Sequence, residues 1–319
     1  MNILLVDEGS NQVSKIRDYI KRAGEEAFEI DTTTFIAAGG SISATYFDGK
    51  LAGEILFPNG QFLELNNVGA LYTRGFNSRF IPAGVQDGEH EKWAIRNSQT
   101  NFNNVTSYLN CAKMNCSQAS LAAINKGEQY KRCAELGIKT PKTLVSNCST
   151  QVSDFISKKQ DVVYKAMAST EGLDEHVIFT NLIKKADVDN AQSLRSVLSY
   201  FQEYVNKDIE IRAYVVGGDV LACEIHSQMS NTAKVDWRRF EISRTPHFSH
   251  SLPSDLERKL RDLVFSYGLA YGAIDLILDK SGQYIFLELN PDGIFDWVDE
   301  LTTLPIAEKI ADWLISARA

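Results

Sequence analysis

Two carboxylates and an amide near the end of the chain have the spacing of a metal site. Residues 272–293 form two alternating segments around Ser281-Gly282, which predicts a β-hairpin. Counted outward from that turn, Asp275 and Glu288 are equidistant, so we expect them to be direct cross-strand partners. Side chains alternate along a strand, which places Asn290 on the same face as Glu288.

Two carboxylates opposed in a hairpin repel each other, and a divalent cation with oxygen ligands would offset that repulsion. Magnesium combines few protein ligands with phosphate oxygens, so the spacing favours a magnesium–nucleotide site. The alternative is an ordinary hairpin whose polar face lies in water.

A second alternating strand, at 208–217, carries further chemistry. Ile209 and Ile211 face one way, whereas Glu210 and Arg212 face the other. An acid and a fixed cation on one face suit a ribose hydroxyl and a phosphate. A surface ion pair is the alternative interpretation.

The segment 234–244 is strongly basic. It holds four cations and two acids, so it is net +2 within a chain of net charge −8. Such a patch could attract an acidic peptide or a nucleotide. Arg238 and Arg239 are the candidates to hold a substrate carboxylate, although a solvated strand edge would look the same.

Together these residues resemble the ATP-grasp superfamily of carboxylate ligases, in which two α+β subdomains grip ATP. The resemblance implies a fold that is α/β and α+β, an ATP-grasp fold with an N-terminal pre-ATP-grasp α/β domain. It implies domains at 1–115, 116–189 and 190–319. It also implies ATP and Mg²⁺ as cofactors.

The resemblance assigns roles residue by residue. Lys126 and Lys165 resemble the two phosphate-binding lysines, and 168–172 takes the place of the phosphate-covering loop. The hinge 201–205 would read adenine, and Glu210 would bind ribose. The resemblance also assigns the hinge role to Glu203, Tyr204 and Val205, and the metal role to Asp275, Glu288 and Asn290. Arg212, from the strand at 208–217, would add a catalytic cation beside the phosphates.

Within the superfamily, the chain is similar to the microviridin-type peptide ligases, also called graspetide synthetases. The similarity is carried by segments such as Glu224-Ile-His-Ser-Gln228 and Val235-Asp-Trp-Arg-Arg239. That family activates Asp or Glu side chains of a precursor peptide with ATP. It joins them to Ser or Thr hydroxyls as ω-esters or to Lys amines as ω-amides. The resemblance therefore implies a leader-bearing precursor peptide as partner, and a homodimer.

One segment departs from that family. The family usually follows Asn-Pro with Asn-Gly-Gln and an aromatic residue, whereas this chain has Asp292-Gly293-Ile294-Phe295. The change affects the acceptor side and leaves the metal residues intact. A ligase of amino acids or other small carboxylates, and a binding module that kept the fold without catalysis, are the competing functions.

The apolar spacing predicts the helices and strands that carry these residues. The first unit should contain a strand, a helix starting at Ser10 or Asn11, a β-meander and a polar helix. The second should contain a helix and two strands, and the third should alternate helix and strand. The expected ranges are 3–6, 11–24, 42–72 and 89–110; 125–136, 161–165 and 176–180; 190–202, 209–216, 220–227, 254–267 and 273–290.

Composition excludes several classes of protein. The 319 residues are 44% hydrophobic and 23% charged, which is typical of globular domains. The net charge of −8 argues against a nucleic-acid partner. No apolar run is long enough for a membrane span, and no signal peptide is evident, so no membrane association is expected. Five scattered cysteines without a CxxC pair favour a reducing cytoplasm.

Overall fold

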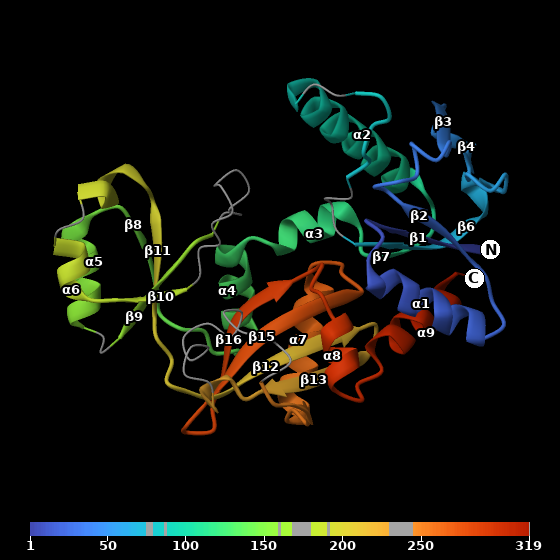
Figure 1. Ribbon diagram of the computed structural model, residues 1–319. Helices are drawn as coiled ribbons and strands as arrows, with labels where there is room; N and C mark the ends of the chain where they lie inside the picture. Colours follow the sequence, from blue (N-terminus) through green and yellow to red (C-terminus); the bar gives the residue numbers. More distant parts are fainter. Residues whose placement is uncertain are drawn as a thin grey trace.

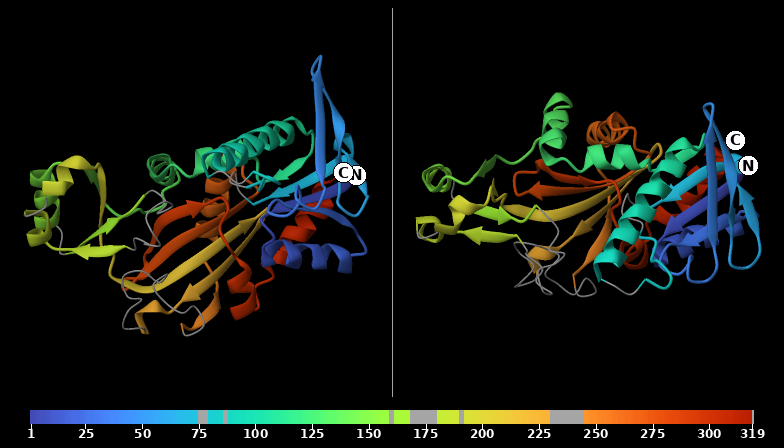
Figure 2. Two further views of the ribbon diagram at one scale, coloured as in Figure 1. Left: turned by 45° about the horizontal axis from the view of Figure 1, so that its top comes forward. Right: turned by 90° about the horizontal axis from the view of Figure 1, so that it is seen from above.

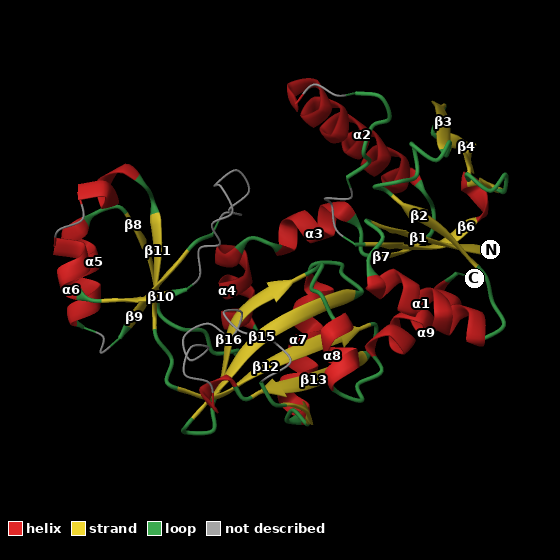
Figure 3. Ribbon diagram, in the orientation of Figure 1, coloured by secondary structure: helices red, strands yellow, loops and turns green. Residues whose placement is uncertain are grey.

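Helices and strands alternate along most of the chain (Figure 3). The computed structural model describes residues 1–74, 79–85, 88–158, 161–167, 180–189, 192–229 and 245–318. Arg238 and Arg239, the expected loop at 168–172 and most of the strand expected at 176–180 lie outside these ranges. No helix among the described residues is long and apolar enough to cross a membrane.

The first unit is built on a parallel sheet in the order β2-β1-β6-β7. Ile3 and Leu5 of β1 enter one hydrophobic cluster, whereas Leu4 and Val6 enter another on the opposite face. Burial on both faces explains why this strand is continuously apolar. The helices and strands here are β1 (Asn2–Asp7), α1 (Asn11–Arg22), β2 (Ala27–Asp31), β6 (Val68–Thr73), α2 (Gly88–Tyr108) and β7 (Ala112–Met114).

The meander predicted at 42–72 is confirmed as far as residue 64, as a small antiparallel sheet in the order β3-β4-β5, whereas residues 68–72 belong to β6 of the parallel sheet. Its strands are β3 (Ser41–Phe47), β4 (Lys50–Leu56) and β5 (Phe62–Glu64), and a short 3₁₀ turn at Leu65–Asn67 leads into β6. The β3–β4 turn places Asp48 and Gly49 at φ of 51° and 70°, the conformation that Asp-Gly hairpin turns favour. Figure 2 shows this hairpin projecting from the first unit.

The middle of the chain forms a second antiparallel sheet in the order β10-β9-β11-β8. Its elements are α3 (Ser117–Ala123), α4 (Lys126–Glu135), β8 (Thr143–Ser146), α5 (Ser149–Ser157), β9 (Val162–Lys165), β10 (Asn181–Ile183), α6 (Lys185–Asp189) and β11 (Ser199–Glu203). The prediction of a helix at 190–202 is wrong. A 3₁₀ turn at Gln192–Ser196 precedes β11, which pairs with β8 and β9 and buries Phe201.

The third sheet has the order β14-β13-β12-β15-β16, and α7 covers one of its faces. Both expected hairpins are confirmed. The expected alternation on β12 also holds, because Ile211 packs in the hydrophobic cluster beneath α7, whereas Tyr214 packs in the hydrophobic cluster on the opposite face of the sheet. The elements are β12 (Lys207–Val216), β13 (Asp219–Ile225), a 3₁₀ turn at Ser227–Met229, β14 (His247–His250), α7 (Ser254–Ser266), β15 (Tyr271–Asp279), β16 (Tyr284–Asn290), α8 (Asp296–Leu301) and α9 (Ile306–Ala317).

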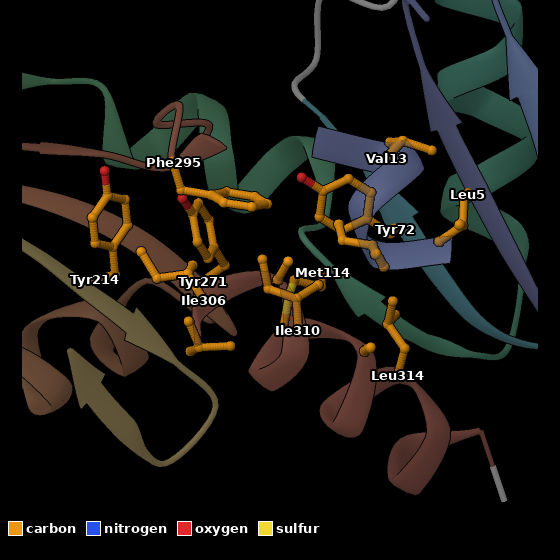
Figure 4. Packing of buried hydrophobic residues seen from close by; sticks show 14 of the residues in the cluster. Leu5, Val13, Tyr72, Met114, Tyr214, Tyr271, Phe295, Ile306, Ile310 and Leu314 are labelled. Atoms are coloured by element: carbon orange, nitrogen blue, oxygen red, sulfur yellow. The ribbon is translucent and has the colours of Figure 1, made fainter. Parts of the chain in front are cut away.

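One hydrophobic cluster joins the first sheet to the third. Leu5 and Tyr72 from the first unit share it with Tyr271, Phe295 and Ile310 from the last (Figure 4). Helix α9 packs against α1, so the two ends of the described chain lie close together (Figure 1). The first unit is therefore anchored to the sheet that carries the predicted metal residues.

Candidate active site

A row of alternating charges crosses three strands of the third sheet. Arg212 on β12 pairs in register with Asp275 on β15, which pairs with Glu288 on β16. The Nη1 of Arg212 donates to Oδ1 of Asp275 at 2.7 Å, and Nζ of Lys126 donates to Oε2 of Glu288 at 2.7 Å. Two cations thus flank the opposed carboxylates, and the predicted pairing of Asp275 with Glu288 is confirmed.

The pairing arises from a bulge that the sequence analysis did not foresee. On the turn side, Leu276 faces Phe286 and Leu278 faces Tyr284, one residue away from the register that we counted. The register shifts between Asp275 and Leu276, so Leu287 is an extra residue on β16. A bulge of this kind re-aims side chains, and here it brings Glu288 opposite Asp275.

The amide of Asn290 completes the polar face. Its Nδ2 donates to Oε1 of Glu288 at 3.1 Å, which leaves Oδ1 as its oxygen donor toward a cation. Carboxylate and amide oxygens are the donors that magnesium prefers. Asp275, Glu288 and Asn290 therefore fit a magnesium ion chemically.

Burial and nearby charges shift the pKa values of the two carboxylates in opposite directions. Burial acts to raise the pKa of Glu288, but the charge and hydrogen bond of Lys126 outweigh it and hold that pKa well below its usual range. Burial raises the pKa of Asp275, and the Glu288 charge adds to this, although Arg212 opposes both. Glu288 is thus the more firmly ionised of the pair.

The Arg212 guanidinium points to an anionic ligand. Its side chain is 8% exposed, yet its Nε has no hydrogen-bond partner among the described residues. A buried N–H without a partner is costly, and a bound phosphate oxygen would satisfy it. The geometry therefore agrees with a phosphate role for Arg212.

Helix α4 positions Lys126 at its first turn. Asn125 caps the helix by accepting the Glu128 N–H, as Asn commonly does. The side chain of Gln129 is fully buried and binds both backbone groups of Leu289, at 2.8 Å and 3.0 Å. Gln129 thus fixes α4 to the strand that carries Glu288. Gln129 was not among the residues predicted from the sequence, where its only signal is a polar side chain on the apolar face of the helix.

Lys165 reaches the same site from the second sheet. It ends β9, opposite Tyr200 of β11, and its charge contributes to lowering the pKa of Glu288. The structure therefore brings Lys126, Lys165 and Arg212 around the two carboxylates. All three are cations that the sequence analysis assigned to phosphate.

The predicted hinge lies where the chain passes from the second sheet to the third. The N–H of Glu203 donates to the Lys142 carbonyl, and the N–H of Tyr204 donates to the Asp161 carbonyl. A base-reading contact at Glu203 would therefore fall to its carbonyl. Val205 follows in the segment between β11 and β12.

Glu210 is buried beside a cation that the sequence analysis did not single out. Lys207 donates to its Oε1 at 2.6 Å, and the Ser227 hydroxyl donates to its other oxygen. Burial nevertheless raises the pKa of Glu210. Both carboxylate oxygens already accept hydrogen bonds, so a ribose hydroxyl would have to share them.

The segment 291–295, where the sequence departs from the family pattern, is a strap held against the site. Asn115 donates to the Pro291 carbonyl at 2.9 Å, Tyr271 donates to the Gly293 carbonyl at 2.5 Å, and Tyr214 donates to the Ile294 carbonyl at 2.9 Å. A Cβ on Gly293 would lie 2.6 Å from Nη2 of Arg212 and 2.2 Å from the Ala273 side chain. Glycine is therefore required for the strap to pass beside Arg212.

Comparisons with known proteins agree with this geometry. The RimK-like ATP-grasp domain family matches residues 123–314. Human N-acetylaspartylglutamate synthase A is 24% identical over 216 residues, or 65% of this chain and 53% of that protein. The mouse protein of the same name matches equally well, and the chain spans about half the length of these curated relatives.

Two solved structures are similar over nearly the whole chain. A RiPP-associated ATP-grasp ligase from Chryseobacterium gregarium, in complex with ADP and a leader and core peptide, has a TM-score of 0.88 and 28% identity, covering 99% of this chain and 97% of its own. The macrocyclase MdnC from Microcystis aeruginosa MRC, bound with precursor peptide MdnA, has a TM-score of 0.86 and 28% identity, covering 99% and 100%. The family match spans more than half of the chain, and the expected fold is confirmed. This chain belongs to the RimK-like ATP-grasp family.

Proposed function

We propose that the protein is an ATP-dependent peptide ligase that forms macrocyclic cross-links in a ribosomal precursor peptide. It joins Asp or Glu side chains of the peptide core to Ser or Thr hydroxyls, or to Lys amines. The observation that carries the proposal is the row Lys126–Glu288–Asp275–Arg212, whose cations and carboxylates suit a nucleotide with its metal. Two similar structures, each 28% identical, hold precursor or leader and core peptides.

The reaction joins a carboxylate to an acceptor at the expense of ATP. The γ-phosphoryl group passes to the substrate carboxylate, which gives an acyl phosphate and ADP. The acceptor oxygen or nitrogen then attacks the carbonyl carbon, the bond to phosphate breaks, and the acceptor releases a proton. Each cross-link therefore removes one water from the peptide, and ADP and phosphate are the other products.

The residues of the chain contribute positioning and charge, which dominate phosphoryl transfer. Lys126, Lys165 and Arg212 offset the negative charge of the phosphates. Asp275, Glu288 and Asn290 would hold magnesium, which when bound neutralises phosphate charge and orients it. Glu210 would bind ribose, and the backbone of Glu203 and Val205, with Tyr204 between them, would hold adenine.

Arg238 and Arg239 are proposed to hold the substrate carboxylate or the acyl phosphate. We further propose domain boundaries near residues 115 and 190. A cytoplasmic location would supply ATP and keep the five cysteines reduced, consistent with all five being free thiols.

The experiment is mass spectrometry of a candidate precursor peptide after incubation with the protein, ATP and magnesium. We expect losses of one water per cross-link, dependent on ATP and absent with a non-hydrolysable analogue. Precursor genes neighbouring this one are the source of candidates. No mass loss for any such peptide, together with ATP-dependent condensation of free amino acids, would replace the proposal.

That competing function has a specific observation behind it. The curated relatives are named for N-acetylaspartylglutamate synthesis, so an amino-acid ligase of the same chemistry is the second candidate. Peptide and free amino acids should therefore be assayed side by side with phosphate release as a common readout.

A further inference from the structure

The hydroxyl of Tyr130 joins helix α4 to one strand of the second sheet and to one strand of the third. It donates to the backbone carbonyl of Leu287 on β16 at 3.3 Å. It accepts from the side chains of Gln202 at 2.7 Å and Tyr200 at 3.1 Å, both on β11. A phenol oxygen offers one donor and two acceptor positions, so these three bonds use its full capacity.

The groups that meet at this hydroxyl are uncharged and largely out of water. Gln202 is 1% exposed, and its amide also donates to the Thr143 hydroxyl of β8 at 3.1 Å. Burial raises the pKa of Tyr130, so its phenol keeps the proton that it shares with Leu287. Removing one member of such a buried network leaves the others without partners, so each group has one favoured position.

On the strand side, the network lies next to the metal site. Leu287 is the bulged residue that directly precedes Glu288. Gln129, which precedes Tyr130 on α4, binds both backbone groups of Leu289. Helix α4 therefore holds the backbone on both sides of Glu288, through Tyr130 before it and Gln129 after it.

On the sheet side, the same network lies next to Lys165. Tyr200 pairs in register with Lys165 of β9, and directly opposed residues point to the same side of a sheet. Phe201, the next residue, packs on the opposite face. Figure 1 shows α4 between this sheet and β16. Lys165 and Glu288 thus belong to different sheets, yet each lies beside a residue of the network.

We propose that Tyr130 is a positioning residue of the nucleotide site, whose hydroxyl sets the position of Lys165 relative to Glu288. Residues 204–206 connect β11 to β12, and short segments of this kind can absorb changes of backbone angle. A contact away from that connection therefore fixes the two sheets relative to one another. Misplacement by about 1 Å can cost an enzyme roughly 100-fold. The inference concerns nucleotide binding and holds for either candidate substrate of the ligase.

Removal of the hydroxyl alone tests the proposal. Tyr130→Phe keeps the ring, which packs edge-on against Phe286. Calorimetry on the full chain with ADP and magnesium should show at least about a fivefold loss of affinity, the scale of one buried hydrogen bond. Tyr200→Phe removes one donor to the network and should cause a smaller loss. Both variants should keep the far-ultraviolet circular dichroism spectrum of the parent chain.

A double variant separates positioning from a direct contact and from a loss of stability. Lys165→Met removes the lysine charge in the parent chain and in the Tyr130→Phe background. Residues that share a network couple, so the fold loss of ADP affinity from Lys165→Met should be at least about threefold smaller in the second background. A purely structural role of Tyr130 would lower the urea midpoint and leave that fold loss unchanged.

Tyr267→Phe is the matched control. Tyr267 is 7% exposed and lies in the hydrophobic cluster beneath α7, against which Tyr130 also packs. Its hydroxyl has no hydrogen-bond partner within the part of the chain that the structure describes. Removing that hydroxyl should therefore change neither the ADP affinity nor the effect of Lys165→Met.

Two results would overturn the proposal. One is an ADP affinity in Tyr130→Phe that equals that of the parent chain. The other is the same fold loss from Lys165→Met in both backgrounds, which would make Tyr130 a direct nucleotide contact or a structural residue. If Tyr130→Phe is too unstable to assay, Tyr200→Phe takes its place in the same comparison. Each measurement omits the peptide, so its outcome is separate from that of the cross-linking assay.

Discussion

At the scale of single residues, the site depends on carboxylates that stay ionised in a partly buried place. Lys126 holds the Glu288 pKa low, whereas burial and the neighbouring charge raise that of Asp275. One carboxylate of the pair is thereby secured as an anion by a cation from another element. A charged oxygen ligand is thus ready at Glu288 over the whole neutral range.

Replacing Glu288 by glutamine tests that role. Glu288→Gln keeps the shape of the side chain but removes its charge, so cross-linking should fall at least roughly 10–100-fold, the loss that even outer-shell changes cause at metal sites. Rates are measured by mass spectrometry at saturating ATP. Glu135→Gln, at an exposed position at the end of α4, is the matched control and should keep full activity. Full activity in Glu288→Gln would refute the metal assignment.

At the scale of elements, α4 matters because it links two parts of the site. Gln129 binds the backbone of Leu289, while Lys126, one turn earlier, binds the neighbouring Glu288. The helix and the strand therefore hold one another in place. Small movements of α4 would separate the lysine from the carboxylate that it neutralises.

Gln129→Met should uncouple the helix from the strand. Methionine has a similar volume but leaves the Leu289 backbone groups without partners, which costs about 1–3 kcal/mol for each buried group. Urea unfolding should show the loss, and nucleotide affinity measured by calorimetry should fall as well. Gln118→Met, a change at an exposed position of α3, is the control. An unaltered affinity would show that Gln129 serves stability alone.

The start of α9 predicts a pH effect. Asp299 accepts the N–H groups of Ile306 and Ala307 at 3.2 Å and 3.4 Å, and burial raises its pKa from the ordinary value of 3.8 to about 6. A raised pKa means that the folded state binds the proton more tightly, so this contribution to stability is present below pH 3.8 and is lost as pH rises through 6.

Asp299→Asn should therefore gain stability relative to the parent chain as pH rises. The gain between pH 4.5 and 7.5 should be about 1 kcal/mol, since partial exposure weakens the effect. Urea midpoints of both chains at the two pH values give the difference, in which other titrating groups cancel. A difference that is constant or that falls with pH would contradict the assignment.

Some of the helices, strands and strand pairings could be predicted from the sequence, and others could not. Alternation on β12 was predictable because side chains alternate along strands. The Asp275–Glu288 pairing was counted from a turn register that is one residue off, and the bulge at Leu287 compensates for that difference. The bulge itself could not be predicted, since backbone pairing decides it. The helix expected at 190–202 failed because Leu194, Leu198 and Phe201 have helical spacing, whereas β8 and β9 offered strand partners to β11. Gln129 and Lys207 were missed because their roles depend on contacts far along the chain.

At the scale of the whole molecule, the first unit packs directly against the part of the chain that carries the site. Its residues share a hydrophobic cluster with the sheet of the site, and Asn115 and Gln12 hold the 291–295 strap. The charge row itself comes from the third sheet and α4. A unit of this size is therefore available for work other than ATP chemistry, such as substrate recognition.

Under the proposed function, recognition of the peptide should extend beyond its reacting groups. A precursor with its leader should be modified at least about tenfold faster than the core alone, because binding energy from remote contacts supports the reaction. Time courses by mass spectrometry compare the two, with the leader added separately as a control. Equal rates would favour the small-molecule ligase.

The charge row has a consequence for the order in which ligands arrive. Glu288 pairs with Lys126, and Asp275 pairs with Arg212. A free divalent cation therefore meets carboxylates that have counter-ions of their own and gains little by binding. A triphosphate brings anions that can take over both cations and release the carboxylates. We therefore expect the metal to bind together with the nucleotide rather than before it.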